Sequence, residues 1–414
     1  VSNGFKYSYS AIIDANVTTI LVAIILAYFG LGPIKGFAVV LIIGVISTII
    51  TAVLFSRLVM DWWLAKDKNL SLQTNFSSGF FTDPKVDWLG KRKIGYIVSS
   101  LIILAGIGSF FGRGFELGVD FKGGYSYNVQ FEESMEVDAQ ALRENLAEVY
   151  GEMPVVKAVD TRNTFNITTA YGIDQSGNNI DAEVMSLLHQ GIDGMTPNKI
   201  DYESFKRSDV SGTHITSFSK VGPIIAEDIV TSSYYATVFA LILIFLYIFI
   251  RFSRWQYSMG AVAALFHDTL VLLAIFSLGY GWLPFSMEID QAFIAALLTV
   301  IGYSINDTVV VFDRIREFGN TYTSRSKTEV VNMAINSTIS RTVITSLTTL
   351  LVVAILFIFG GSSIKGFAFA LVIGVIVGTY SSVFVASPIM SDLTPDLSGG
   401  RSSQKKKQTS TTSA

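Results

Sequence analysis

Ionisable side chains inside long apolar runs are the residues of this sequence whose type and position could do chemistry. Asp307, Arg341 and Asp268 lie within such runs or at their start. A charged group at the centre of a bilayer costs about 2.5–3.5 kcal/mol on insertion scales, so its retention indicates a function. At about 1.5 Å of rise per residue, Asp307 lies about 9 Å before Asp313, which we expect at the cytoplasmic edge. Asp307 is therefore predicted inside the membrane.

The polar residues near Asp307 and Arg341 follow helical spacing. Tyr303 precedes Asp307 on its own face, whereas Thr345 and Thr348 follow Arg341. If the two stripes face each other, Asp307 and Arg341 pair as ions, and protonation of Asp307 would release Arg341. This spacing predicts a two-state element driven by a proton. A static buried salt bridge, or an arginine that reaches the inner interface, is the alternative.

The oxygen atoms around Asp307 leave the identity of a coupling ion open. Asn306, Ser304 and Thr308 surround it in the sequence. Together with the carboxylate, they supply ligands of a type that either a proton relay or a sodium site uses. The sequence does not separate these two possibilities.

The pair His267-Asp268 is a weaker candidate. Adjacent residues of a helix point about 100° apart, so we expect that they do not jointly hold a metal and that only one faces a helix interface. Asp268 is predicted to be a structural or accessory polar group. The charged run at residues 313–317 is predicted to be a solvated helix end, with Arg314 and Arg316 as orientation anchors.

Long apolar helices must position these side chains. The chain has 414 residues, of which 50% are hydrophobic and 15% charged, against about 25% charged residues in soluble domains. This composition excludes an ordinary soluble enzyme and predicts an integral membrane protein. About eight runs are long enough to span a bilayer. They lie at residues 11–29, 36–58, 94–111, 230–250, 257–278, 289–312, 342–359 and 366–387.

Composition and missing motifs exclude several other classes. The net charge of −3 argues against nucleic-acid binding, and the lack of cysteine excludes disulfides and thiolate sites. No zinc-protease motif, intramembrane-protease motif or phosphate-binding loop is present. We expect no cofactor and no ATP hydrolysis. An ion gradient is the natural energy source, because one charge crossing 100 mV is worth about 2.3 kcal/mol.

The distribution of Lys and Arg predicts the orientation. Basic residues cluster in short loops that alternate with base-poor loops, which places the basic loops in the cytoplasm. The long segment at residues 113–228, where acids outnumber bases, then falls on the opposite side. The basic loops contain Lys66, Lys68, residues 91–93, Arg251, Arg254, Arg314, Arg316, Arg325, Lys327 and residues 405–407.

The segment at 113–228 has the pattern of one soluble α+β domain. Its order of predicted elements is β-α-β-β-α-β, which is that of a ferredoxin-like sandwich. His189 and His214 lack the spacing of a metal site and are predicted to be surface or core residues. The strands are predicted at residues 125–131, 155–159, 165–169 and 214–219, and the helices at 137–150 and 182–190.

An internal repeat relates the two ends of the chain. Residues 10–53 align without gaps on residues 340–383, including the Lys-Gly-Phe-Ala turns that begin at Lys35 and Lys365. Both copies are helical hairpins with the same direction. They therefore predict a parallel repeat about a pseudo-twofold axis normal to the membrane.

Several motifs together resemble the SecD/SecF family of protein-export membrane proteins, within the resistance-nodulation-division superfamily. The match to SecF covers residues 80–392, and residues 1–63 are similar to the last two membrane helices of SecD. The motifs are residues 118–124, 217–223, 267–268, 301–317 and 340–349 for SecF, and residues 14–19 and 32–38 for SecD.

The resemblance implies a division of the chain into six parts. The first three are a SecD-like hairpin at 1–63, a cytoplasmic linker at 64–92 and a first SecF-like helix at 93–112. They are followed by a periplasmic ferredoxin-like domain at 113–228, five further SecF-like helices at 229–392 and a disordered, basic cytoplasmic tail at 393–414.

The resemblance also implies a function in protein export. Asp307 and Arg341 match the family's proton-relay residues, in a non-hydrolytic subunit of the bacterial inner membrane that assists preprotein translocation. The implied partners are the SecYEG channel, the preprotein, SecA indirectly, and a SecD portion outside this chain, with YajC or YidC as further candidates. A second relay aspartate is expected in that SecD portion, so these residues alone are expected to be incompetent for transport.

Two other classes remain open. A small-molecule or lipid exporter of the same superfamily would share an intramembrane aspartate, but it is expected to have larger soluble domains with an apolar cleft. A scaffold that only holds the Sec channel together would not need Asp307, so Asp307→Asn would then be silent.

Overall fold

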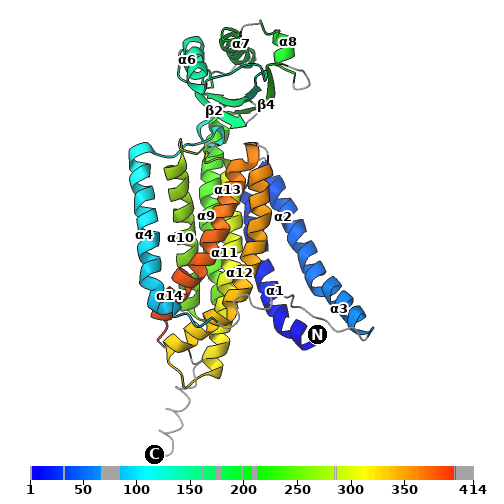
Figure 1. Ribbon diagram of the computed structural model, residues 1–414, viewed down its shortest axis with the longest axis vertical. Coiled ribbons are helices and arrows are strands. Elements are labelled where there is room, and N and C mark those ends of the chain that lie inside the picture. Colours follow the sequence, from blue (N-terminus) through cyan, green and yellow to red (C-terminus); the bar gives the residue numbers. More distant parts are fainter. Residues whose placement is uncertain are drawn as a thin grey trace, which may run out of the picture.

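The structure is a computed structural model, and eight of its helices are long and apolar enough to cross a membrane. Figure 1 shows them as one bundle with a small mixed domain at one end. The multi-pass helical architecture predicted from hydropathy is thus confirmed. The structure describes residues 2–30, 33–66, 84–160, 163–173, 175, 179–196, 199–207, 212–283, 285, 287–360, 362–395 and 397. The predicted basic tail lies almost entirely outside this part of the chain.

The long helices follow the apolar runs in order along the chain. They are α1 (Ser2–Phe29), α2 (Pro33–Ile49) with a π-helical segment (Ile50–Phe55) and α3 (Ser56–Leu64), α4 (Trp88–Arg113), α9 (Pro223–Phe252), α10 (Trp255–Gly279), α11 (Gln291–Thr321), α12 (Lys327–Phe359), and α13 (Ser362–Ser381) with a π-helical segment (Ser382–Ala386) and α14 (Ser387–Leu393).

The helix α12 extends well beyond its predicted span. The run at residues 342–359 belongs to α12, which already begins at Lys327. Ser326 and Glu329 form a capping box there, with each side chain bonding the backbone of the other residue. Such a cap satisfies free amide groups at a helix start, so the helix continues into polar surroundings. The apolar run therefore marks only the second half of α12, up to its end at Phe359.

The centre of the bundle is α11, which packs closely against α13. Gly374 and Gly378 lie one turn apart on α13 and face α11, because a methyl group on them would meet Val300 and Ser304 within 3 Å. Small residues at this spacing let helix backbones approach in a membrane. The close approach brings the polar residues of the two helices together.

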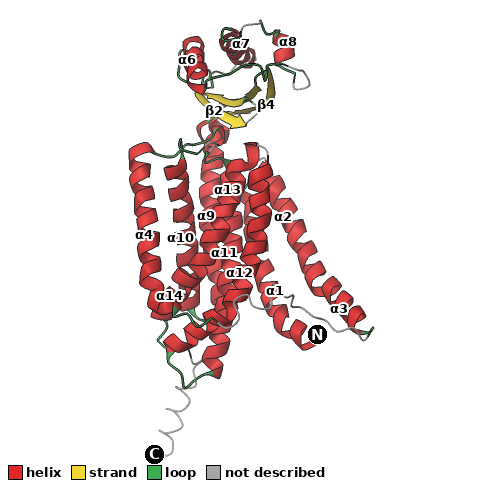
Figure 2. Cartoon of the chain, viewed as in Figure 1, coloured by secondary structure: helices red, strands yellow, loops and turns green. Residues whose placement is uncertain are grey.

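The soluble domain contains one four-stranded antiparallel sheet in the order β2-β3-β1-β4 (Figure 2). Tyr125, Tyr127 and Val129 point from β1 into a core with two helices, as the alternation of β1 predicts. The predicted order of long elements is confirmed, with ends shifted by a few residues. The elements are β1 (Gly124–Gln130), α6 (Ala139–Tyr150), β2 (Val155–Asp160), β3 (Thr164–Thr169), α7 (Ile180–Asp193) and β4 (His214–Val221), with two short helices, α5 (Val119–Lys122) and α8 (Tyr202–Phe205), that were not predicted.

A pair of glycines joins α5 to the sheet. Gly123 and Gly124 have φ angles of 72° and 139°, which side chains disfavour. A methyl group on Gly124 would also meet the carbonyl oxygen of Thr169 at 2.7 Å. The turn between α5 and β1 therefore requires glycine at both positions.

Candidate functional site

Asp307 lies in the middle of the bundle, where only 3% of its surface is exposed. Ser346 of α12 and Thr379 of α13 donate hydrogen bonds to its Oδ2, at 3.2 and 3.3 Å. The two hydroxyl groups are 2.6 Å apart, and Tyr303 donates to Ser346 at 3.4 Å. Asp307 is thus the centre of a small hydroxyl cluster among three helices. Such a carboxyl can accept or release a proton, but its charged form is costly in this environment.

Arg341 is not part of this cluster. Its side chain is exposed on α12, and among the described residues no ion pair joins it to Asp307. The two predicted stripes do not face each other, because α12 turns Ser346 rather than Arg341 toward Asp307. The expected ion pair is therefore absent from this conformation of the described residues.

The predicted accessory residues divide into two groups. Tyr303 reaches the cluster, as described above, and Asn306 is half-buried with an amide oxygen that has no partner among the described residues. Thr345 and Thr348 instead donate to carbonyl groups of their own helix, α12. These two threonines do not contribute to the cluster.

His267 and Asp268 form a second buried centre. They are 8% and 2% exposed, and the His267 ring contacts the Asp268 carboxylate at 2.9 Å. Ser304 and Ser381 donate to Asp268 Oδ2 at 2.6 and 2.9 Å, and His267 Nε2 lies 2.7 Å from the hydroxyl of Ser99. The expectation that only one of the pair faces a helix interface is wrong. Both residues face a helix interface, because α4 covers the side of α10 that carries His267, and α11 and α13 cover the side that carries Asp268.

The two centres share the same two helices. Ser304 and Asp307 are three residues apart on α11, and Thr379 and Ser381 are two residues apart on α13. Residues three apart on a helix are neighbours. A shift of α11 against α13 would therefore change the hydrogen bonds of both carboxyl groups at once.

A third polar network joins α1, α9 and α11 in the part of the bundle away from the sheet. Arg251 bonds Asp14 Oδ2 at 2.6 Å and Asp313 at 3.2 Å, while Tyr247 donates to Asp14 at 2.8 Å. Arg316 also binds Asp313, at 2.7 Å. The run at 313–317 is thus more than a solvated helix end, because Asp313 ties α11 to α9. The sequence alone does not indicate the contact between Arg251 and Asp313, because the two residues are far apart along the chain.

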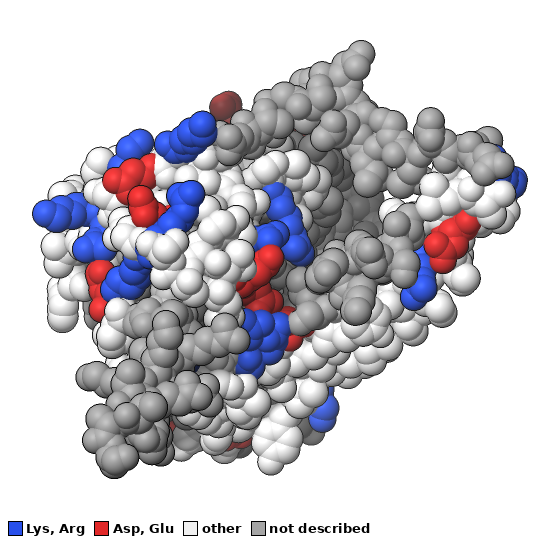
Figure 3. Space-filling model, turned by 90° about the horizontal axis from the view of Figure 1, so that it is seen from below, with Lys and Arg blue, Asp and Glu red and all other residues white. Residues whose placement is uncertain are grey.

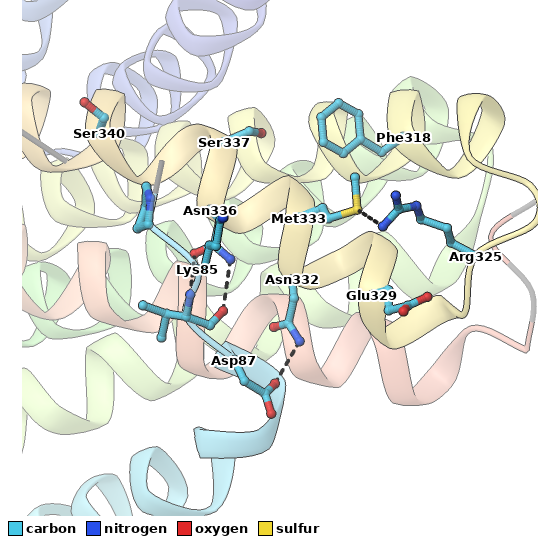
Figure 4. Close-up of a pocket in the computed structure, with 12 residues that line it drawn as sticks. Lys85, Asp87, Phe318, Arg325, Glu329, Asn332, Met333, Asn336, Ser337 and Ser340 are labelled. Atoms are coloured by element: carbon cyan, nitrogen blue, oxygen red, sulfur yellow. Dashed lines mark hydrogen bonds between the residues drawn. The ribbon is translucent and has the colours of Figure 1, made fainter. Parts of the chain in front are cut away.

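A cavity of about 780 Å³ lies beside α12, at the end of the bundle away from the sheet. Figure 4 shows how residues 84–87 dock on α12 there. Asn336 receives a bond from the Trp88 ring at 2.8 Å and donates to the Val86 carbonyl at 2.9 Å, and Asn332 donates to Asp87 at 2.8 Å. Two asparagines one turn apart therefore fix the start of α4 against α12.

The histidines of the soluble domain have structural partners. His189 contacts the carbonyl of Ile200 at 2.7 Å and packs on Tyr202 and Phe205, while His214 contacts the carbonyl of Gly212 at 2.8 Å. Within the described residues, no group of three or more His, Cys, Asp or Glu side chains is placed to hold a metal ion.

The fold and the buried centres together define a polytopic helical membrane protein with intramembrane carboxyl groups and one soluble domain. Residues 202–396 match the family described as protein export membrane protein SecD/SecF, C-terminal, and residues 108–135 match the SecD/SecF GG motif. Gly123 and Gly124 lie within the second match. The chain belongs to the SecD/SecF family.

Individual relatives give the same result. The chain is 45% identical to protein translocase subunit SecF of Rhodothermus marinus, over 76% of this chain and 94% of that protein. It is 33% identical to protein translocase subunit SecDF of Thermus thermophilus, over 94% of this chain. The crystal structure of SecDF from that organism superposes with a TM-score of 0.78 at 31% identity. The chain spans about half the length of these SecDF proteins, with 49% covered in each comparison.

Proposed function

We propose that this chain is the SecF-type part, with the last two SecD-type helices, of an accessory subunit of the Sec translocase. It uses a transmembrane proton gradient to assist preprotein translocation. The observation that carries this proposal is Asp307, a carboxyl buried among α11, α12 and α13 in a chain similar to proteins named translocase subunits. A carboxyl in apolar surroundings is kept at a cost, which a coupling function accounts for.

A proton is the better candidate than sodium. Ser304 and Thr308 are directed away from the Asp307 carboxylate, because Ser304 donates to Asp268 and Thr308 donates to a carbonyl of its own helix, while Asp307 accepts from Ser346 and Thr379. The side chain of Asn306 has a buried oxygen without a described partner and does not bond Asp307. Two hydroxyl donors on one carboxylate oxygen suit a group that gains and loses a proton.

Arg341 is proposed to approach Asp307 in a second conformation. Ser346 already contacts Asp307 from the same helix, and Arg341 lies about one and a half turns before it. Rotation or sliding of α12 would bring the guanidinium to the ionised carboxylate. Protonation of Asp307 would then release it.

The orientation is proposed with the sheet in the periplasm. Lys and Arg side chains are visible on the face opposite the sheet domain (Figure 3), where the basic loops of the sequence lie. Cytoplasmic loops carry such an excess of Lys and Arg.

The strand order β2-β3-β1-β4, with α6 and α7 packed on the sheet, supports a ferredoxin-like domain. We propose that the protein lies in the inner membrane, with a cytoplasmic carboxyl terminus.

The pseudo-twofold repeat is supported by equivalent residues of the two hairpins. Phe37 and Phe367 are 330 positions apart, and their rings touch with centroids 5.9 Å apart. Gly30 and Gly360 are equivalent as well, and each packs against an isoleucine four residues later. Equivalent residues meet each other where a twofold axis passes between them.

The proposed partners are the SecYEG channel and the translocating preprotein. SecA acts indirectly, because it starts the process before the gradient-dependent step. A SecD portion outside this chain supplies a second aspartate, and YajC or YidC are further candidates. The subunit itself is proposed to hydrolyse nothing.

The test compares wild type with Asp307→Asn in membrane vesicles that contain the full-length protein, SecYEG, SecA and ATP. Completion of preprotein translocation is measured with and without a proton gradient. We expect the gradient-dependent part to disappear in Asp307→Asn, whereas membrane insertion and association with the channel persist. The neutral amide keeps the shape of the side chain but cannot exchange the proton.

A matched control is Asp392→Asn. Asp392 is exposed and pairs with Arg92 at 2.9 Å, away from the hydroxyl cluster. This variant should keep the gradient-dependent step. If Asp307→Asn also keeps the gradient-dependent step, the proposal fails. A scaffold or a small-molecule exporter of the same superfamily then becomes the better hypothesis.

A further inference from the structure

The soluble domain is joined to the helices by an ionic contact as well as by the chain itself. Lys157 lies on β2, an edge strand of the sheet. Its ammonium group forms ion pairs with Glu116 and with Glu288, the latter at 2.6 Å. Glu116 follows α4, and Glu288 precedes α11. One lysine of the sheet therefore contacts both chain segments at the outer end of the bundle.

These ion pairs are mostly removed from solvent. The side chains of Lys157, Glu116 and Glu288 are 17%, 9% and 20% exposed. Exposed ion pairs contribute little, but partly buried pairs are screened much less by salt. Loss of one partner would leave charges without compensation.

The two glutamates belong to one backbone-paired unit. Leu117 and Ile289 form a parallel bridge, in which the Ile289 amide donates to Glu116 at 2.7 Å and the Gly118 amide donates to Ile289 at 3.0 Å. The Gln291 amide donates to Asp120 at 3.1 Å. Lys157 therefore holds a unit that is continuous with the first residue of α11.

The helix that begins at this unit carries Asp307. At about 1.5 Å per residue, Asp307 lies about 24 Å along α11 from Gln291. A helix transmits axial displacement along its length with little loss. A shift of α11 at Asp307 would therefore move Glu288, and the ion pair would move β2 with it.

A cavity of about 410 Å³ lies between β2 and the loop after α10, lined by Val155, Arg143, Leu283 and Phe285 next to the ion pairs. Elsewhere, α5 packs on α9 through Val119, Phe121 and Ala226. The apolar contacts of α5 thus lie at α9, whereas the ion pairs of Lys157 lie just before α11, and β2 also contacts α13.

We propose that Lys157 is a positioning residue that couples α11 to the soluble domain, so that movement at Asp307 reaches the sheet through Glu288. This inference rests on the proposed function, because it assigns the path by which the gradient-dependent step reaches the soluble domain.

The first test uses Lys157→Met and Lys157→Arg in the full-length protein, in the vesicle assay described above. Lys157→Met keeps the length of the side chain but loses both ion pairs, and we expect the gradient-dependent rate to fall about tenfold. Lys157→Arg keeps the charge and should retain most of the rate. Lys206→Met is the matched control, because Lys206 forms an exposed pair with Glu203 in the same domain. Translocation without a gradient should be unchanged in all three variants.

The second test replaces the ion pair by a covalent link. The chain has no cysteine, so Lys157→Cys with Glu288→Cys introduces the only two thiols. With both thiols reduced, we expect the gradient-dependent rate to be as low as in Lys157→Met. A short bifunctional thiol reagent that joins them should restore it, and each single-cysteine variant treated in the same way should stay low.

The outcomes separate this inference from the proposed function. If Asp307→Asn abolishes the gradient-dependent step while Lys157→Met retains it, Lys157 is only a structural contact and the inference fails alone. The inference also fails if the linked protein stays as slow as the reduced one, or if the thiols cannot be linked in folded protein. If Asp307→Asn has no effect, the proposed function itself fails.

Discussion

At the residue scale, the outer end of α11 begins at a carboxyl group whose charge is disfavoured. Burial raises the pKa of Asp290 from 3.8 to about 7, and the negative charges of Asp120 and Glu288 add to the effect. The same carboxyl accepts a hydrogen bond from the Phe293 amide at 2.7 Å and so caps the helix. Burial also raises the pKa of Glu116 and of Asp120 nearby. Burial at this end of the molecule therefore makes the charged forms of these three carboxyl groups more costly than in water.

The raised pKa of Asp290 gives a pH dependence of stability with a defined sign. Because the folded value of about 7 exceeds the ordinary 3.8, its stabilising contribution is complete below pH 4 and is lost as the pH rises through 7. Asp290→Asn keeps a good helix cap but has no titrating proton to lose as the pH rises. We expect the midpoint of thermal unfolding in detergent to fall less between pH 6 and pH 8 in this variant than in wild type.

A second cap residue is the control for that measurement. Asp201 caps α8 from an exposed position, and hydrogen bonds from Ser204 lower the pKa of its carboxyl. Asp201 is ionised throughout this pH range, so Asp201→Asn should leave the slope of wild type unchanged. Equal slopes for wild type and Asp290→Asn would show that Asp290 does not titrate there.

Residue type alone could identify some of the site but not all of it. Asp307 and Asp268 were predictable, because an acid in an apolar run is rare and costly. Ser346 and Thr379 were not predictable as members of the site, because hydroxyl residues are common in membrane helices and usually form hydrogen bonds with their own backbone. Only the packing of α12 and α13 decides that these two turn toward Asp307, whereas Thr345 does not.

At the element scale, the two glycines of α13 decide how close it comes to α11. Gly374 faces Val300, and a methyl group there would lie 2.0 Å from a methyl of that side chain. Its equivalent in the other hairpin, 330 positions earlier, is Gly44, where an added methyl would meet nothing within 4 Å. The same residue type in equivalent positions thus has different surroundings.

This difference predicts opposite effects of one substitution. Gly374→Ala should destabilise the protein by about 1–3 kcal/mol, because overpacking forces α11 and α13 apart. Gly44→Ala should be neutral or stabilising by up to about 1 kcal/mol, since alanine is the better helix former. Thermal unfolding of both variants in the same detergent measures the contrast. Equal stability of the two variants would contradict the close packing of α13 on α11.

Hydropathy predicted the number and order of the long helices because the cost of exposing polar groups to lipid is large and local. Hydropathy did not predict that α12 begins at Lys327 instead of near residue 342. The boundary of a helix that continues into water is set by its capping residues, which hydropathy does not measure. The strands of the soluble domain were predictable from alternation, which burial of one sheet face imposes. The ion pairs of Lys157 were not predictable, because Glu116 and Glu288 are distant from it in the sequence.

At the scale of the whole molecule, the sheet domain and the basic end lie at opposite ends of the bundle (Figures 1 and 3). The proposed orientation then predicts which residues are accessible from each side of the membrane. Ser134 lies in an exposed turn of the soluble domain, and Thr323 lies in the exposed turn between α11 and α12. Because the chain has no cysteine, Ser134→Cys and Thr323→Cys each introduce one thiol.

A membrane-impermeant maleimide should label the two variants differently. In cells whose outer membrane has been made permeable, we expect Ser134→Cys to react and Thr323→Cys to react only after the inner membrane is also opened. Labelling of denatured protein is the control for intrinsic reactivity of each thiol. The reverse pattern would place the sheet in the cytoplasm, where the soluble domain could not act on a preprotein that emerges on the other side, and the proposed orientation would have to be abandoned.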